Sequence, residues 1–221
     1  MDLLKILKEK IQSKTAKVAV IGLGYVGLPV ACMLAEAGFR VIGVDLKKDR
    51  IKLINSGVSP IEGNEPGLSE LLLSVVQRGN FTATTDYQKL SDVDIVLIDV
   101  ETPIDENHVP QYVALRSACK SLGNVLKQGA LVIVESTIAP GTMNKVVRPI
   151  IEETSGKKSG ISFFLGACPE RVMPGKLLAN LRDMSRVCGG ETLDVAVTMT
   201  NFYQHIVQSD LDTSDLITAE V

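Results

Sequence analysis

Three glycines within six residues could bring the backbone of this chain against a phosphate group. In VIGLGYVGLP the pattern G-x-G-x-x-G falls on Gly22, Gly24 and Gly27, directly after a β-branched run and directly before a helical stretch. The first glycine permits a tight turn, the second lets the main chain touch a diphosphate, and the third lets helix and strand pack closely. The unpaired N–H groups of that helix then face the phosphates. The sequence therefore predicts a dinucleotide site.

A single acid follows the glycine turn at a distance that suits the same ligand. Asp45 lies eighteen residues after Gly27, at the end of the second apolar run, where it could accept hydrogen bonds from an adenosine ribose. An acid there disfavours a 2′-phosphate, so NAD is favoured over NADP. Lys47, Lys48 and Arg50 follow it. They could hold the extra phosphate if they pointed inward, although three cations that open a helix more often form a solvated face.

Further polar residues follow the later apolar runs, at the carboxyl ends of strands where open α/β sheets bind their ligands. Thr102 and Thr137 would bring hydroxyl groups to this rim, and Pro103 would stiffen the loop behind the first of them. Glu170 and Arg171 follow a later run, and a structural ion pair with each other or with neighbours is the simpler interpretation of them. Three cations lie downstream, and we expect each of them to be solvated: Lys176, Arg182 and Arg186.

The elements that must position these residues are predicted from hydrophobic periodicity. Strands are expected at Lys17–Ile21, Arg40–Val44, Asp94–Val100, Ala130–Glu135 and Ser162–Leu165. Helices are expected at Leu3–Ser13, Leu28–Ala37, Lys47–Ser56, Gly67–Gln77, Val113–Leu126, Thr142–Glu153, Gly175–Leu181 and Leu193–Tyr203, and a last one begins after a cap at Ser214 or Asp215. Strands alternating with helices predict a doubly wound, Rossmann-like α/β fold with a mainly parallel sheet and helices on both faces.

Composition excludes several functional classes. The 221 residues are 45% hydrophobic and carry a net charge of −3, so nothing attracts the chain in general to nucleic acid or anionic lipid. No apolar run is long enough to span a membrane, and the amphipathic start is unlike a secretory signal, so we expect a cytoplasmic protein. The four cysteines are scattered and predict buried free thiols with no metal site. His108 and His205 are isolated, and neither is assigned to catalysis.

The order of the motifs resembles one enzyme family. GLGYVGLP, GVD, ETPIDE, VESTIAPGT and CPERVMPGKLL together resemble the UDP-glucose/GDP-mannose dehydrogenase family, from about Lys17 to the last residue. Within it, PERVMPGK and ESTIAPGTM are most similar to the UDP-N-acetyl-D-mannosamine 6-dehydrogenase branch, with UDP-N-acetylglucosamine 6-dehydrogenases as near relatives. Pro174 stands where UDP-glucose dehydrogenases usually have a second acid, which favours the acetamido-sugar branches.

The resemblance implies a reaction and a set of site residues. Members of the family oxidise the C6 alcohol of a nucleotide sugar to a carboxylate in two hydride transfers, with two NAD and a cysteine-bound thiohemiacetal and thioester. The matching cofactor positions are Tyr25, Val26, Asp45, Arg50, Thr102 with Pro103, and Thr137. Arg171 and Val172 match positions that touch the sugar nucleotide. Glu170 and Thr137 match a water and proton network near the reacting carbon and are the predicted catalytic residues.

Part of the family pattern has no counterpart in this sequence. None of the four cysteines stands in a segment like GGxCxPKD, and the family's connector-helix lysine and asparagine would follow Val221. We therefore expect a helical extension at 1–16, an NAD-binding Rossmann-like domain at 17–213 and the start of the connector helix at 214–221, without the central and C-terminal domains. Such a chain would lack full activity. Full-length relatives are homo-oligomers, and we expect this chain to be a monomer or a weak dimer.

Two other interpretations remain open. A relative of the β-hydroxyacid dehydrogenases would share the glycine turn, but it would need a catalytic lysine on a later helical domain, and CPERVMPGK argues against it. A non-catalytic, NAD-responsive binding module would instead complement a separate C-terminal chain. In every case the expected ligands are NAD and, for the enzyme, a UDP-N-acetylhexosamine, with no nucleic acid, membrane or metal.

Overall fold

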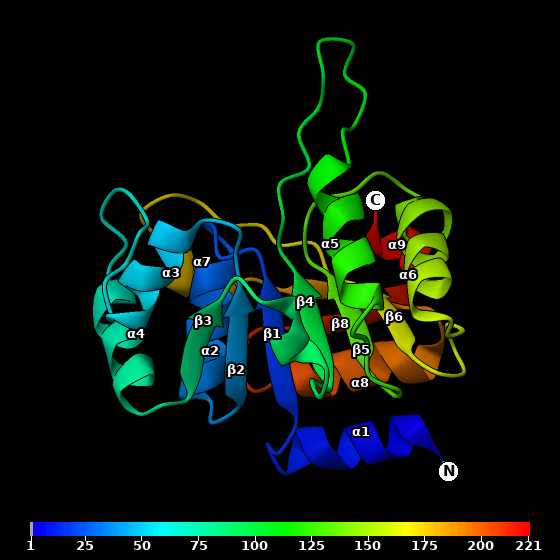
Figure 1. Cartoon of the computed structure of the whole chain (residues 1–221), viewed down its shortest axis with the longest axis horizontal. Helices are drawn as coiled ribbons and strands as arrows, with labels where there is room; N and C mark the ends of the chain where they lie inside the picture. Colours follow the sequence, from blue (N-terminus) through cyan, green and yellow to red (C-terminus); the bar gives the residue numbers. More distant parts are fainter. Residues whose placement is uncertain (1) are drawn as a thin grey trace.

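Eight strands form one sheet in the computed structural model, which describes residues 2–221 (Figure 1). In spatial order they are β3 (Phe81–Thr84), β2 (Arg40–Val44), β1 (Lys17–Ile21), β4 (Ile95–Ile98), β5 (Leu131–Val134), β6 (Phe164–Ala167), β7 (Arg186–Gly190) and β8 (Leu211–Asp215). The first six run parallel, and β7 pairs antiparallel with β6 and parallel with β8. The predicted doubly wound, mainly parallel sheet is confirmed.

Helices cover both faces of this sheet. One face carries α1 (Leu3–Gln12), α2 (Gly27–Glu36), α3 (Lys48–Asn55), α4 (Leu68–Gln77), α7 (Leu177–Asp183) and α8 (Leu193–Tyr203). The other carries the 3₁₀ turn η1 (Tyr87–Leu90), α5 (Val113–Gly123), the π-helical turn η2 (Met143–Val147), α6 (Arg148–Ser155) and α9 (Leu216–Ala219). In β4, Ile95 and Leu97 pack on the first face while Val96 and Ile98 pack on the second. Burial on both faces explains why the central strands are continuous apolar runs.

The chain reverses its direction across the sheet between β1 and β4. It first moves outward from β1 through β2 to β3, and it then crosses back to β4, which pairs with β1 on its other side. At such a switch point the loops after the two strands diverge and leave a crevice at the carboxyl ends. The loop that joins β4 to α5 projects well beyond the helices at this end of the sheet (Figure 1).

Some element predictions were wrong, for physical reasons. The sequence pattern did not predict β3, β7 or β8, because β3 is a four-residue edge strand, β7 ends in two glycines and β8 is a polar, partly exposed edge. The strand predicted at Ser162–Leu165 lies two residues later, at Phe164–Ala167. The helix predicted from Thr142 begins as a π-helical turn, and the one predicted at Gly175–Leu181 begins at Leu177.

The last predicted helix is confirmed in its start and in its cap. Thr218 N donates to Asp215 Oδ1 at 2.9 Å, so Asp215 is the N-cap of α9. Glu220, at the end of α9, accepts from Gly141 N at 2.6 Å and from Met143 N at 2.7 Å. These two bonds bind the last turn of the chain to the loop after β5.

Asp94 bonds α1 to the amino-terminal ends of the central strands, at the end of the sheet opposite the crevice. Lys10 Nζ lies 2.8 Å and Lys127 Nζ 2.5 Å from Asp94 Oδ1, and Lys17 N donates to Oδ2 at 3.0 Å. Burial by itself would raise the pKa of the carboxyl, but the hydrogen bonds from the two lysines and the backbone outweigh it and lower that pKa below its ordinary value.

We predict that Asp94→Asn destabilises the fold by about 2 kcal/mol at pH 7, because hydrogen bonds to a buried charged group are lost. The native pKa lies below the unfolded value of about 3.9, so the stabilisation is present above that value and is lost as the pH falls through the native pKa. Urea denaturation at pH 7 and near pH 3 should show the difference from wild type shrinking with acid. Asp92→Asn, at an exposed pair with Lys17, should cost less than about 1 kcal/mol, and equal losses would contradict the assignment.

Candidate functional site

A cavity of about 360 Å³ lies in the crevice between β1, β2 and β4. The glycine turn, the residues after β2 and the residues after β4 form its walls, and Tyr87 of η1 lies at its side. The helix α5 contributes only small side chains, Ala114, Ser117, Ala118 and Ser121. A second cavity of about 260 Å³ continues along the turn to Arg50 and residues 60–62. The two together suit a long ligand with one flat end.

The glycine turn has the two properties that a diphosphate site requires. Gly22 has a φ of +96°, and an added Cβ would lie 2.2 Å from the carbonyl oxygen of Asp99, so no other residue fits there. A Cβ on Gly24 would instead meet no atom within 4 Å, which leaves the backbone open to an approaching ligand. The N-cap of α2, Val26, makes no side-chain cap bond, and the first turn of α2 contains no acid. The positive end of that helix dipole is therefore free for an anion.

Asp45 is buried and already organises the turn. Its Oδ2 accepts from Leu23 N at 3.1 Å and from Arg50 Nη1 at 2.8 Å, and its Oδ1 accepts from Lys47 N at 2.9 Å. Lys47 and Lys48 are exposed, as expected of a solvated face. Arg50 departs from that expectation, because it is half-buried on Asp45 and lines both cavities. The acid and this cation thus present a paired surface at the end of β2.

The loops after β4 and β5 are joined at the rim. Thr102 Oγ1 donates to the carbonyl oxygen of Thr137 at 2.7 Å, and Ser136 Oγ donates to the carbonyl of Val100 at 2.6 Å. Pro103 and the side chain of Thr137 are exposed. The structure therefore brings the two predicted threonines together, and the Thr102 hydroxyl is engaged by the backbone of the neighbouring loop.

Glu65, which the sequence analysis did not single out, connects the glycine turn to the segment after β6. Its carboxylate accepts from Gly175 N at 2.8 Å, from Leu177 N at 3.2 Å and from the Tyr25 hydroxyl. Burial and the Glu65 carboxylate raise the pKa of Tyr25 to about 12. Sequence reasoning had no signal for this residue, because its partners lie 40 and about 110 positions away.

Glu170 lies in a buried cluster of charges at the ends of the central strands. Its carboxyl faces the guanidinium of Arg186, and both side chains are at most 5% exposed. Arg186 Nη1 also lies 3.6 Å from Glu135 Oε1, to which the Tyr203 hydroxyl donates at 2.6 Å. The register explains the meeting: β6 and β7 pair Ala167 with Gly189, so continuing the antiparallel ladder sets residue 186 opposite residue 170.

This environment gives Glu170 an unusual ionisation. Burial is the main reason that the pKa of Glu170 is raised to about 8. Burial and the nearby Glu135 carboxylate together outweigh the attraction of Arg186 and Arg171, which lowers the pKa. The expectation that Arg186 is solvated was wrong. The expected ion pair of Glu170 exists, but with Arg186, since Arg171 is exposed and donates to the carbonyl of Ser185 at 2.9 Å. Val172 is half-buried against the core.

The remaining predictions concern thiols, metals and membranes. All four cysteines are buried and free, as predicted. Within residues 2–221 no group of three or more potential ligands is placed to hold a metal ion. None of the helices described over the same range has the length and apolar character needed to cross a bilayer.

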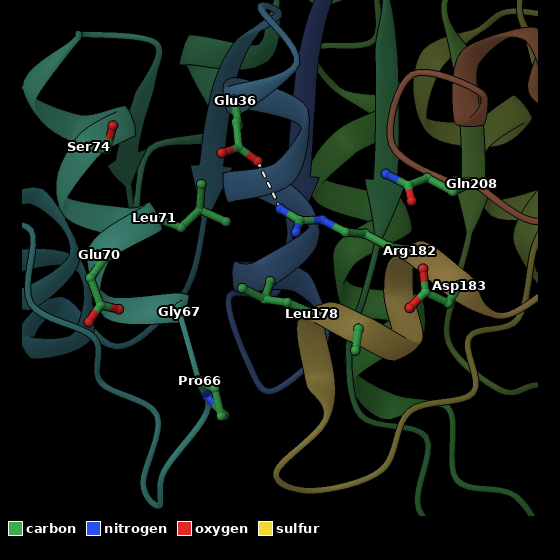
Figure 2. Close-up of a pocket in the computed structure, with 11 residues that line it drawn as sticks. Glu36, Pro66, Gly67, Glu70, Leu71, Ser74, Leu178, Arg182, Asp183 and Gln208 are labelled. Atoms are coloured by element: carbon green, nitrogen blue, oxygen red, sulfur yellow. Dashed lines mark hydrogen bonds and ion pairs between the residues drawn. The ribbon is translucent and has the colours of Figure 1, made fainter.

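A larger groove, of about 660 Å³, lies between α4 and α7, on the face of the sheet that also carries α2 (Figure 2). Glu36, Glu70 and Asp183 line it, and its one arginine, Arg182, is paired with Glu36 at 3.1 Å. This excess of carboxylates does not suit a diphosphate. The crevice at the glycine turn is therefore the better candidate for the dinucleotide.

Comparisons with known proteins identify the family of the chain. Residues 16–207 match the model of the UDP-glucose/GDP-mannose dehydrogenase family, NAD binding domain. The UDP-N-acetyl-D-mannosamine dehydrogenase of Pyrococcus horikoshii is 37% identical over 205 residues, which cover 93% of this chain and 48% of that protein. The UDP-N-acetyl-D-glucosamine 6-dehydrogenase of Pseudomonas aeruginosa is 34% identical over 195 residues, or 88% of this chain and 44% of that protein.

A solved structure extends the likeness to the whole fold. The NDP-N-acetyl-D-galactosaminuronic acid dehydrogenase of Methanosarcina mazei Go1 superposes with a TM-score of 0.92 at 35% identity, over 100% of this chain and 48% of that one. The chain thus spans about half the length of the curated relatives it matches.

We predict that Gly24→Val abolishes NAD binding without unfolding the chain. The new side chain has room in the folded protein but occupies the space through which a diphosphate reaches the backbone. Isothermal titration calorimetry should show an affinity at least about 100-fold weaker, the equivalent of roughly 2.8 kcal/mol, with a nearly unchanged melting temperature.

The matched variant is Gly22→Ala. Its Cβ would clash with the Asp99 carbonyl at a positive φ, so the free energy of unfolding should fall by more than about 2 kcal/mol. Retention of NAD binding by Gly24→Val would show that the ligand lies elsewhere.

Proposed function

Because the chain belongs to the UDP-glucose/GDP-mannose dehydrogenase family, we propose that it is the NAD-binding N-terminal part of a nucleotide-sugar 6-dehydrogenase that oxidises UDP-N-acetylmannosamine or UDP-N-acetylglucosamine. Family members are NAD-dependent dehydrogenases, and NAD is the cofactor of this domain. The observation that carries the proposal is that Glu170 follows β6, at the same carboxyl-terminal end of the parallel strands as the glycine turn after β1 and Asp45 after β2.

The cofactor end of the site follows from the geometry at β1 and β2. NAD supplies the acceptor for the hydride that leaves the sugar carbon. The open backbone at Gly24 and the uncapped start of α2 hold its diphosphate, with Tyr25 and Val26 in the same turn. Asp45 faces the adenosine ribose, and its charge opposes a 2′-phosphate.

The sugar end of the site lies where the chain leaves β5 and β6. Thr137 and Glu170 follow these neighbouring strands, so a hydroxyl and a carboxyl border the place where the sugar meets the cofactor. A carboxyl with a pKa of about 8 can take up and return a proton near neutral pH, as each oxidation of an alcohol requires. Arg171 and Val172, in the loop after Glu170, contact the sugar nucleotide in this proposal.

The acetamido sugar is the finer part of the proposal. It rests on the motifs PERVMPGK and ESTIAPGTM, on Pro174 and on the printed names of the relatives, two of which act on UDP-N-acetylhexosamines. Since the names of these two relatives give different sugars, the proposal includes both UDP-N-acetylmannosamine and its epimer UDP-N-acetylglucosamine.

The nucleophile of the second oxidation is not among the cysteines of this chain. All four cysteines are buried. Burial raises the pKa of the Cys32 and Cys119 thiols, and the neighbouring Cys188 thiol together with burial raises that of Cys168, so none of these three is a ready thiolate. We propose that a segment outside residues 1–221 supplies it. In this division, 1–16 are a helical extension, 17–213 the NAD-binding domain and 214–221 the start of a connector. For the same reason, a non-catalytic NAD-responsive module that complements a separate chain is the second candidate.

Cofactor titration and complementation test the two candidates. The chain alone should bind NAD and form no NADH from UDP-N-acetylmannosamine or UDP-N-acetylglucosamine, as followed by absorbance at 340 nm. Addition of the C-terminal half of a relative should restore NADH formation if the chain is the cofactor half of the enzyme. Continued silence with a folded partner that binds the chain would favour the binding module.

We predict that Asp45→Asn weakens NAD binding about tenfold, which is the equivalent of roughly 1.4 kcal/mol, because the neutral amide is a poorer acceptor for the ribose hydroxyls. NADP should lose less or gain, since Arg50 is released from its carboxylate partner and the charge opposing a 2′-phosphate is gone. Parallel titrations with NAD and NADP measure the change in preference. Asp49→Asn, at a fully solvated acid on α3, is the control and should leave the preference unchanged.

A further inference from the structure

Asp99 and Glu135 bring two carboxyl groups together beneath the glycine turn. They follow the adjacent parallel strands β4 and β5, which pair Ile98 with Val134, so the next residue of each strand lies side by side with the other. By the alternation of the strands both side chains point to the face that carries α2 and α8. The Asp99 carboxyl is within hydrogen-bonding reach of that of Glu135.

The surroundings of this pair leave no donor between its members. Asp99 Oδ2 and Glu135 Oε2 are buried without a hydrogen-bond partner, while the Tyr203 hydroxyl donates to the other oxygen of Glu135. Arg186 is the guanidinium that faces the cluster, and it meets Glu170 as well. Glu135 and Glu170 therefore share this one buried cation, and Asp99 lies next to Glu135 without an ion pair of its own. Two ionised carboxylates repel each other strongly in such a place, and a proton held between their oxygens would relieve that repulsion.

The pair is in contact with the turn that receives the diphosphate. Asp99 lines the cavity of about 360 Å³. A Cβ added to Gly22 would lie 2.2 Å from the carbonyl oxygen of Asp99, and a Cβ added to Gly27 would lie 3.0 Å from the Cβ of Asp99. Asp99 therefore lies directly against both ends of the turn. The first turn of α2 carries neither an acid nor a base that could screen it.

We propose that the shared proton of Asp99 and Glu135 is a working part of the dinucleotide site, and that NAD binds only while the pair retains it. The inference rests on the proposed NAD site. Loss of the proton adds a negative charge beneath the diphosphate of NAD, which carries two, in surroundings where water screens poorly. By reciprocity, bound NAD holds the proton more tightly, so binding above the pKa of the pair takes up a proton.

The ionisation of the neighbouring groups defines the pH range to examine. Burial, and then the Glu135 carboxyl, raise the pKa of Asp99 well above its ordinary value. Burial raises the pKa of Tyr25 and of Tyr87, on the cofactor side, to about 12. Burial also raises the pKa of Tyr203 well above its ordinary value, and the neighbouring Cys188 thiol together with burial does the same for the Cys168 thiol. Arg186 stays charged. Glu170, with a pKa of about 8, is the competing group between pH 6 and 9.

The test is the affinity of the chain for NAD from about pH 6 to 9.5, measured by isothermal titration calorimetry. Affinity should fall with rising pH, approaching the limit of about tenfold per pH unit for one linked proton. Asp99→Asn, which imitates the neutral acid, should bind NAD at pH 6 within about threefold of wild type and should keep that affinity at pH 9. A pH-independent wild type, or the same slope in Asp99→Asn, would overturn the inference.

Two variants test which group carries the linked proton. Glu170→Gln should keep the pH dependence of NAD affinity. If the pH dependence disappeared in Glu170→Gln, the linked proton would belong to Glu170, and the role of the Asp99–Glu135 pair would be refuted. Glu153→Gln removes an equal charge from an exposed position on α6 and should keep the dependence as well.

A further measurement covers the case in which Asp99→Asn does not fold. At pH 8.5 the heat of NAD binding to wild type should vary with the ionisation enthalpy of the buffer, because a proton is taken up. A heat that is equal in phosphate and Tris buffers would overturn the inference. If NAD fails to bind at pH 6 and at every other pH, the proposed function fails instead.

Discussion

The site depends on one close approach, that of the glycine turn after β1 to the backbone at the end of β4. Only a residue without a Cβ lets the two chains touch, and the φ of Gly22 then turns the chain directly into α2. The contact aims the uncapped start of α2 at the crevice, and it sets Asp99 beneath the turn. Diphosphate recognition and the buried acids of the sheet are thus joined by the same few atoms.

Buried charges are paired differently at the two ends of the strands. At the amino-terminal end, Asp94 accepts hydrogen bonds from two lysines and a backbone N–H, and this complete pairing stabilises the fold. At the carboxyl-terminal end, Glu135 and Glu170 share the guanidinium of Arg186, and Asp99 Oδ2 and Glu135 Oε2 have no partner. Such incomplete pairing costs stability. It also raises the pKa of Asp99 and of Glu170 above their ordinary values.

Segments far apart in the chain complete the site. Glu65 bonds the glycine turn to the backbone at Gly175 and Leu177, so the segment that follows Arg171 and Val172 is joined to the glycine turn by hydrogen bonds. Glu220 likewise holds the loop after Thr137 through the N–H groups of Gly141 and Met143. The family match covers residues 16–207 of this arrangement, and the solved relative covers all of the chain, which spans about half of that relative.

The sequence by itself determined the parallel βαβ order, the glycine turn, the acid at the end of the second strand and a last helix capped by Ser214 or Asp215, of which the structure selects Asp215. Each of these depends on residue types within a few turns of helix or one βαβ unit. It did not reveal β7, whose two glycines weaken the strand pattern, nor the buried position of Arg186. Only the tertiary structure decided that Arg186 meets Glu170, that Asp99 meets Glu135 and that Glu65 meets Gly175. These contacts follow from strand order and register across long separations in the chain, and no local preference of the backbone encodes them.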